Sequence, residues 1–581
     1  MKAMKKRKIV SIILVLAVLL SWGVFFGDAT EVAEELQQRK IHERLYEELE
    51  TMEDDEKVSV VIWLTDIDVK AVEKKALEKA GVDPKQLLPQ ISELNFTNNM
   101  WRTSAKTQSR ELTEEGKQYV LSIAESTEEN RKKQTKEIHK YLYAKRDLVA
   151  EESSAKNMAF QKERFKKNEV LYIGQYSPML VAKLSKKTIL SFEENPNVSM
   201  VLLYEESQVV SAESIGVGVS NISANYTRDT LGYNGEDIII GQIEAEAAGA
   251  DHWQRVRDIM VGPDGMVPQA TVHRELVDDP IDIYSAVDDL IALGVDIINM
   301  SAGIYNNGVY DDLCVFVDYV VATFGITFVV SAGNNGEESQ WGEEIGTIAS
   351  PGMANNAITV GAIDPKGTVT TIDDELCAYS SYIEGNYQVE KPDVVAPTVG
   401  VNGGTSFSAP YVAGLAAQLM DKEPALIGNA LKVKAIIMAG CNRKTTENMG
   451  SLTEKEGAGV VNAVTSMTYS NNWSVSGSIN YNTTTRSYSK YLKANTPATI
   501  VLVWNRNALR SGTYVHSYPH TDWDLKVIGS GCNVTYNSVT PYNNVEYIRF
   551  IPPVSGNYVI EIKLYGETDT NTQYAIAVNQ F

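Results

Sequence analysis

Cysteine and histidine are scarce in this chain of 581 residues, which has four of the former and six of the latter. The cysteines lie far apart and form no Cys-x-x-Cys pair, which argues against a metal site built from clustered cysteines. A disulfide between two of them and four free thiols are both compatible with this spacing. The cysteines are Cys314, Cys377, Cys441 and Cys532.

Basic residues are also under-represented, since 53 Lys and Arg stand against 75 Asp and Glu, for a net charge of −22. Nucleic acids and anionic membranes are bound through basic surface, so this charge argues against both as partners.

Low-complexity tracts are absent as well. The length predicts three or four globular domains of about 150 residues each.

The N-terminus departs from this acidic average. Lys2, Lys5, Lys6, Arg7 and Lys8 precede an apolar run over residues 9–26, the layout of an export signal. The run is also just long enough to span a bilayer, so residues 1–29 are either a cleaved signal or an uncleaved anchor. Both alternatives predict a secreted or extracytoplasmic protein, with membrane contact only if the segment stays uncleaved.

Residues 30–211 have the pattern of a small α+β domain. A strand is expected at 58–64, a helix at 69–80, and two further strands at 176–184 and 198–204. Between them, residues 105–168 are dense in charge and sparse in apolar positions, which predicts long solvated helices.

Over residues 212–468, short apolar strands alternate with helices, which predicts a parallel α/β sheet. Ligands of such sheets bind at the carboxyl ends of the strands, so catalytic residues should follow strands. The expected strands are 238–243, 296–300, 327–330 and 357–360.

After about residue 470 the helical pattern ends, and alternating segments separated by turns predict an antiparallel β-sandwich over 469–581. Its expected strands are 474–479, 498–504, 525–528, 545–550, 556–564 and 574–578.

The most informative stretch runs from Gly404 through Thr405, Ser406, Phe407, Ser408 and Ala409 to Pro410. Glycine permits a close backbone approach, and the proline falls early in a run with helical spacing, where its missing N–H costs least. A serine here lies where backbone N–H groups and the helix dipole favour a developing negative charge. Capping alone would explain a Gly-Thr-Ser turn, but the whole string resembles the serine motif of the subtilisin-like proteases (subtilases). The run Lys391–Pro397 also resembles the family's approach to this serine.

A serine nucleophile needs a base, and elimination favours His252. His42 and His139 lie in the N-terminal domain, His516 and His520 in the sandwich, and His273 within a predicted strand. His252 precedes a predicted helix over 253–260, whose Val256, Ile259 and Met260 would face inward, and subtilases have their catalytic histidine at the start of such a helix.

The acid of the triad departs from the family. Subtilases have aspartate at the end of the first core strand, where this chain has Glu244, with Glu246 as the competing acid. Glutamate orients the histidine in other hydrolase triads, but its extra methylene requires the backbone or the histidine to retreat. Both carboxylates could also be ordinary loop residues.

The segment around His252 departs further. Only seven residues separate Glu244 from His252, and Trp253, Gln254 and Arg255 replace the Gly-Thr-His expected after the histidine. Small residues there let the helix pack closely, so the bulky ones are expected to shift His252.

The remaining parts agree better with the family. Residues 331–336 follow a predicted strand and resemble the oxyanion segment, in which Asn334 would donate its side-chain N–H together with the backbone N–H of Ser406. Such a donor is worth about 2.7–4 kcal/mol, a magnitude measured in subtilisin. As an alternative, Gly-Asn-Asn-Gly is a common turn. Ser301, Ala302 and Gly303 resemble the substrate-binding edge segment and leave the specificity pocket open.

The resemblance implies a subtilisin-like catalytic domain over 212–468 of an exported serine endopeptidase made as a zymogen. It implies protein or peptide substrates, with residues 30–211 as a propeptide that inhibits the active site. The sandwich resembles the jelly-roll domains that follow some bacterial subtilases, although a stabilising or carbohydrate-binding module is equally compatible. No cofactor is required, and structural calcium is possible. An oxyanion asparagine and a histidine disfavour the related Ser-Glu-Asp peptidases. The rival interpretation is a pseudoprotease with a disabled histidine region, acting as a binding or regulatory protein.

Overall fold

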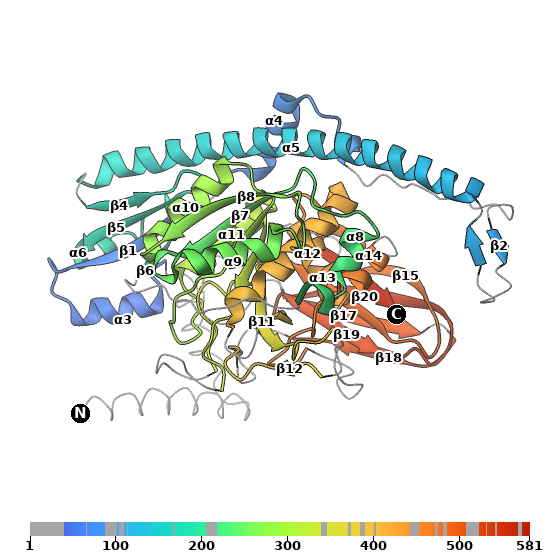
Figure 1. Cartoon of the computed structure of the whole chain (residues 1–581). Helices are drawn as coiled ribbons and strands as arrows, with labels where there is room; N and C mark the ends of the chain where they lie inside the picture. The colour runs from blue at the N-terminus through green and yellow to red at the C-terminus, as the bar shows by residue number, and fades with distance from the viewer. Residues whose placement is uncertain are drawn as a thin grey trace, which may run out of the picture.

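Three globular parts make up the computed structural model, in the chain order that the sequence predicts (Figure 1). The structure describes residues 40–65, 67–87, 101–103, 110–112, 114–166, 169–204, 218–337, 346–369, 373–383, 390–399, 403–441, 452–470, 474–479, 485–506, 522–529, 531–540, 543–566 and 572–580. The predicted signal or anchor over 1–29 and the domain junction at 205–217 lie outside these ranges.

The N-terminal part contains an antiparallel sheet with the strand order β4-β5-β1-β6. Both faces of β1 are buried, because Val61 and Trp63 pack towards the second domain while Val60 and Ile62 pack towards α3. Strand β4 was not predicted. The elements are α3 (Glu43–Thr51), β1 (Lys57–Leu64), α4 (Val69–Ala80), η1 (Pro84–Leu87), β2 (Trp101–Thr103), β3 (Arg110–Leu112), α5 (Glu114–Arg164), β4 (Val170–Ile173), β5 (Met179–Ser185), α6 (Lys186–Leu190) and β6 (Val198–Leu203).

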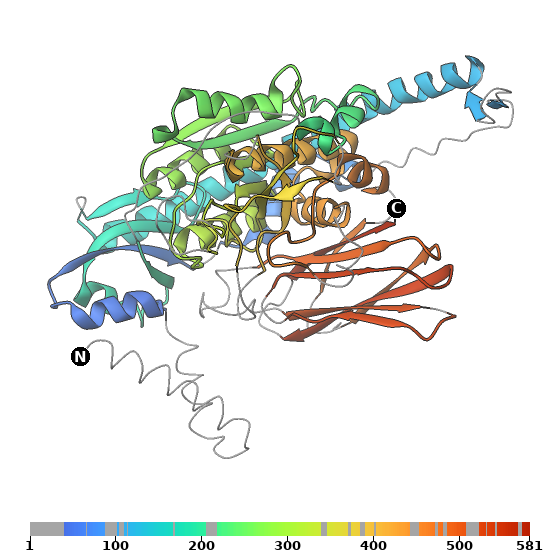
Figure 2. The same cartoon turned by 60° about the horizontal axis from the view of Figure 1, so that its bottom comes forward.

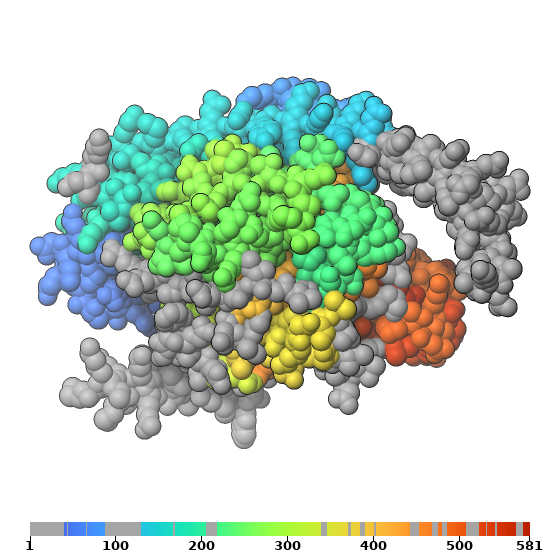
Figure 3. All heavy atoms as spheres, viewed as in Figure 1, coloured from blue at the N-terminus to red at the C-terminus, as the bar shows by residue number. Residues whose placement is uncertain are grey.

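Helix α5 corrects the prediction of solvated helices over 105–168. It is one 51-residue helix, and its part from residue 129 onwards lies across one side of the second domain and shares a continuous surface with it in the space-filling view (Figures 1 and 3). Ile138 and Leu142 are buried in the core of that domain. His139 Nε2 lies 2.9 Å from Asp296 Oδ1, and Arg146 donates to the carbonyl of Val295 at 2.7 Å. The charged sequence of α5 therefore includes a face that docks on the second domain. The polar side chains buried on this face are bonded to partners across the interface, which offsets the cost of burying them.

The second domain is built on a seven-stranded, mostly parallel sheet of order β12-β11-β10-β9-β7-β8, with β13 beside β11. Helices cover both faces: α9, α12 and α13 share one hydrophobic core, and α10 and α11 share the other. The strands are β7 (Ile239–Ala245), β8 (Thr271–Val277), β9 (Ile297–Met300), β10 (Thr327–Ser331), β11 (Ile358–Asp364), β12 (Glu375–Leu376) and β13 (Val394–Pro397). The helices are α7 (Gly218–Asn221), α8 (Ala224–Asp229), η3 (Glu246–Ala248), α9 (Ala250–Val261), α10 (Pro280–Ala292), α11 (Asp312–Phe324), η4 (Thr405–Phe407), α12 (Ala409–Lys422), η5 (Pro424–Leu426), α13 (Ala430–Ala439) and α14 (Ala463–Ser470).

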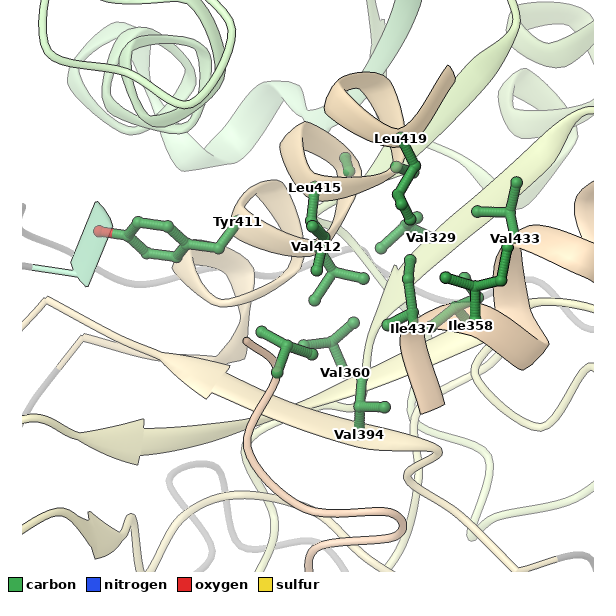
Figure 4. Packing of buried hydrophobic residues seen from close by; sticks show 14 of the residues in the cluster. Val329, Ile358, Val360, Val394, Tyr411, Val412, Leu415, Leu419, Val433 and Ile437 are labelled. Atoms are coloured by element: carbon green, nitrogen blue, oxygen red, sulfur yellow. The ribbon is translucent and has the colours of Figure 1, made fainter. Parts of the chain in front are cut away.

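Helix α12 is buried along its length and fixes the serine turn that precedes it. Its Val412, Leu415 and Leu419 point towards the sheet residues Val329 and Val360 (Figure 4). At about 1.5–3 kcal/mol for each fully buried apolar side chain, this packing is a strong anchor for the turn.

The C-terminal part consists of two four-stranded antiparallel sheets, of order β14-β21-β16-β19 and β15-β20-β17-β18, which confirms the predicted sandwich. It lies below the second domain in Figure 2. Asn356 accepts from the backbone N–H of Arg506 at 2.8 Å and donates to its carbonyl at 2.9 Å, which ties the two domains together. Strands β15 and β18 were not predicted. The strands are β14 (Ser474–Ile479), β15 (Thr485–Leu492), β16 (Ala498–Trp504), β17 (Asp522–Gly529), β18 (Thr535–Ser538), β19 (Val545–Phe550), β20 (Gly556–Gly566) and β21 (Thr572–Gln580).

Two further findings concern the chain as a whole. All four cysteines are free thiols, three of them buried. No helix in the described part of the chain combines the length and the apolar character needed to cross a membrane.

Candidate active site

Ser406 lies in the 3₁₀ turn η4, directly before α12, as the motif predicts. Gly404 opens the turn at φ 79°, a conformation that favours glycine. Its N–H donates to the Tyr379 hydroxyl at 2.9 Å, and its carbonyl accepts from Thr398 Oγ1 at 2.9 Å. The carbonyl of Ser406 accepts from Ser301 Oγ at 2.7 Å. The backbone on both sides of the serine is therefore held in place.

Asn334 follows β10 and contacts the same turn. Its Oδ1 accepts from the backbone N–H of Thr405 at 2.9 Å. A backbone N–H can only donate, so this bond fixes which side of the amide is oxygen and leaves Nδ2 as the donor. Nδ2 lies on the Gly404 side, 3.3 Å from where a Cβ at that glycine would stand. The first N–H groups of a helical turn have no intrahelical partner, so the Ser406 N–H is available as a donor. Asn334 Nδ2 is a second donor beside the serine.

Glu244 and His252 come together at the carboxyl end of β7. His252 lies in the first turn of α9, and its Nδ1 is 3.0 Å from Glu244 Oε2. The N–H is not aligned for a linear hydrogen bond, a looseness common in unliganded sites. Both side chains are buried. The helix begins at Ala250, three residues before the predicted start at Trp253, and Val256, Ile259 and Met260 face inward as predicted.

The histidine ring also approaches the serine turn. Its centroid lies 4.9 Å from that of Phe407, the residue after Ser406. His252 Nε2 is buried and has no hydrogen-bond partner among the described residues, so no bond to Ser406 Oγ is formed in this state.

The two candidate acids differ in surroundings. Glu244 is buried against His252, whereas Glu246 lies in the short helix η3 with its carboxyl bonded to Asp278. That contact raises the pKa of Glu246. Burial raises the pKa of Glu244, and this effect is opposed by His252, Gln242 and Arg274, which favour the ionised form.

Two residues of this site were not identified from the sequence. Gln242, two positions before Glu244 on β7, donates from Nε2 to Glu244 Oε1 at 3.1 Å and to the Trp253 carbonyl at 2.9 Å. Trp253 donates from its indole N–H to the Ala245 carbonyl at 2.9 Å. The sequence signal that could have identified Gln242 was an amide side chain inside the otherwise apolar run 238–243. Trp253 ties α9 to β7 and His252 is buried, and the shift of His252 expected from the bulky residues stays a prediction.

The residues predicted to bind substrate follow β9. Ser301 and Ala302 are buried and Gly303 is half-buried. The Ser301 hydroxyl accepts from Asn299 Nδ2 at 3.0 Å and donates to the Ser406 carbonyl. Ser301 therefore supports the backbone of Ser406. Substrate contact of the segment stays a prediction.

No group of three or more His, Cys, Asp or Glu side chains with the geometry of a metal site occurs in the described ranges. Structural calcium stays a prediction.

Comparison with known proteins relates the second domain to a known family. Residues 276–459 match the subtilase family, a range that includes Asn334 and Ser406 and begins after Glu244 and His252. The chain is 32% identical over 215 residues to the serine protease AprX of Bacillus subtilis (strain 168), covering 33% of this chain and 43% of AprX. It is 24% identical over 326 residues to subtilisin NAT of Bacillus subtilis subsp. natto, covering 49% of this chain and 81% of that protein.

A solved structure, the epidermin leader peptide processing serine protease (EpiP) of Staphylococcus aureus, aligns with 54% of this chain and 97% of its own. Its sequence identity is 16% and its TM-score 0.38. The family match and the sheet topology, by contrast, confirm the fold class: residues 276–459 are similar to the subtilase family and belong to a subtilisin-like parallel-sheet domain.

Proposed function

We propose that this protein is a serine endopeptidase in which Ser406 is the nucleophile, His252 the base and Glu244 the orienting acid. The observation that carries the proposal is the convergence of three separate segments at one end of the sheet. The turn before α12 contacts Asn334, and the ring of His252 lies between Phe407 and Glu244.

The mechanism follows from the types of group present. His252 Nε2 accepts the Ser406 hydroxyl proton as Oγ attacks the scissile carbonyl, and then donates it to the leaving amine. Glu244 stabilises the imidazolium that forms. The negative charge on the carbonyl oxygen is met by Asn334 Nδ2 and the Ser406 N–H. Water then hydrolyses the acyl-enzyme by the same steps.

The N-terminal domain is proposed to be an intramolecular propeptide of an exported zymogen. Its support is the extensive docking on α10: Tyr204 donates to Asp279 at 2.6 Å, and the Gln175 N–H donates to Asp288 at 2.8 Å. Protein or peptide substrates, export and inhibition by this domain belong to the same proposal.

Covalent labelling of the processed protein, obtained from the full-length chain, with a fluorophosphonate probe tests the proposal. Ser406 should be labelled, and Ser406→Ala should abolish both labelling and peptide hydrolysis. If the chain matures itself, Ser406→Ala should also accumulate unprocessed precursor. A folded, processed protein that takes up no label would instead identify a pseudoprotease with a binding role.

A further inference from the structure

Gln242 is a fully buried amide in strand β7, which lies between β8 and β9 in the sheet. Alternate side chains of a strand point to the same face, so Gln242 and Glu244 share the face that α9 covers. Ile243 lies on the other face, in the core that contains α10. A buried amide costs free energy unless its polar atoms are bonded, so its retention here needs an explanation.

The amide joins two elements that must meet for catalysis. Nε2 donates to Glu244 Oε1 and to the Trp253 carbonyl, one residue beyond His252. Oε2 of Glu244 faces His252 Nδ1 at 3.0 Å, so the two carboxylate oxygens face different neighbours. Gln242 Oε1 is buried without a hydrogen-bond partner in the described ranges. The amide is therefore used as a donor, and its acceptor oxygen is kept in the core at a cost in stability.

Glutamate needs such a restraint more than aspartate does. Its extra methylene adds a rotatable bond, whose freedom must be removed to hold the carboxylate in one place. We propose that Gln242 is a positioning residue that fixes the carboxylate of Glu244 with Oε2 towards His252. The proposal rests on the proposed peptidase function of Ser406. It adds to that function a residue that compensates for glutamate where subtilases have aspartate.

The charged groups around Glu244 set the direction of the expected effect. His252 faces it from α9 and Arg274 acts on it from β8, where it pairs in register with Gln242 and lies over the Trp253 ring at 5.1 Å. Removing the Gln242 donor leaves the carboxylate less stabilised and a stronger base. The carboxyl of Glu244 should then hold its proton to a higher pH, and because the ionised carboxylate is the active form, the acid limb of activity should move upward.

The test is the rate of fluorophosphonate labelling of Ser406 against pH, in the processed protein. Gln242→Met keeps the volume and removes the donor. It should shift the acid limb upward by about one unit and slow labelling at pH 7 about tenfold, as expected for a lost bond to a charged group. Gln242→Asn keeps a shorter amide and should recover part of the loss. In a Glu244→Gln background, Gln242→Met should cause no further loss.

Gln418→Met is the matched control. Gln418 is also fully buried, and its Nε2 donates to the Met266 carbonyl at 2.9 Å, three turns beyond the serine turn in α12. This variant should lower the melting temperature and leave the pH profile unchanged. If folded Gln242→Met and Gln242→Asn both keep the wild-type profile, the positioning role is wrong and the peptidase proposal stands. A folded, processed wild-type protein that is unlabelled at every pH would overturn both.

Discussion

The site has two halves that are built in different ways. The serine half, made of Ser406, Thr405, Asn334 and Ser301, is held by several backbone hydrogen bonds between segments more than 70 residues apart. The histidine half, made of Gln242, Glu244, His252 and Trp253, comes from twelve consecutive residues, 242–253. Its Glu244–His252 contact is not aligned, and Nε2 of His252 has no partner among the described residues.

Because of this difference, substitutions in the two halves should have different effects on folding and on activity. The segments of the serine half also form the centre of the sheet, so folding the domain assembles that half. The histidine half depends on a short connection between β7 and α9, with a longer acid than the family has. We therefore expect the serine half to fail through lost oxyanion binding or stability, and the histidine half to fail through lost proton transfer.

The largest effect is expected for Glu244→Gln. An amide cannot stabilise the imidazolium or select the histidine tautomer, so kcat should fall about 10⁴-fold, as for Asp→Asn in a Ser-His-Asp triad. Peptide hydrolysis by purified, processed enzyme measures this loss. Glu246→Gln is the matched control and should retain activity. If Glu246→Gln inactivates and Glu244→Gln does not, the acid is Glu246.

Glu244→Gln should also stabilise the fold at neutral pH. Burial raises the folded-state pKa of Glu244 above its ordinary 4.5. The contribution of Glu244 to the stability of the fold is therefore fully present below pH 4.5. It is lost as the pH rises through the folded-state pKa of this residue. Glu244→Gln removes this loss. Thermal unfolding between pH 4 and 9 should show an equal or higher melting temperature for the variant at neutral pH. A lower one would contradict the assigned direction.

In the serine half, Asn334→Asp should reduce kcat by about 10²–10³. Aspartate keeps an oxygen for the Thr405 N–H and replaces the donor Nδ2 with a second oxygen. Asn334→Ala removes both functions, so it should show a similar loss of kcat and also reduced stability. Single-turnover acylation rates and thermal melts distinguish the two variants. Equal kcat for Asn334→Asp and wild type would exclude Asn334 from the oxyanion site.

Thr405→Val should act mainly on stability. The hydroxyl accepts from the Gly333 N–H at 3.1 Å, and valine of similar shape would leave that buried N–H unpaired. A loss of about 1–3 kcal/mol in the free energy of unfolding is expected, measured by denaturant titration. Thr405→Ser keeps the hydroxyl and should recover most of it. A loss of kcat without a loss of stability would place Thr405 in the chemistry instead.

The smallest effect is expected for Trp253→Phe, which keeps an aromatic ring beneath Arg274 and removes the bond to the Ala245 carbonyl. A neutral hydrogen bond contributes about 0.5–1.5 kcal/mol, so kcat/KM should fall a few-fold. Trp253→Gly restores the small residue that the family has and should be worse, because it also removes the packing. A gain of activity in Trp253→Gly would show that the tryptophan obstructs His252.

Much of the fold could be predicted from periodicity. The strands at 498–504 and 545–550 and the helix at 69–80 have the predicted bounds. Strands β15 and β18 were missed because exposed edge strands carry polar residues and little apolar alternation. Helix α5 was predicted as solvated because its docking face contains His139 and Arg146, whose burial depends on partners in a distant segment.

The sequence by itself determined the class of domain and placed Ser406, because a glycine-rich turn leading into an apolar helix is written locally in one stretch. The structure alone decided that Glu244 contacts His252, that Gln242 joins Glu244 to the Trp253 carbonyl, and that Trp253 fastens α9 to β7. Those contacts depend on side-chain length and direction across two packed elements. A strand pattern of apolar residues records which face is buried, but it does not record which atoms meet there.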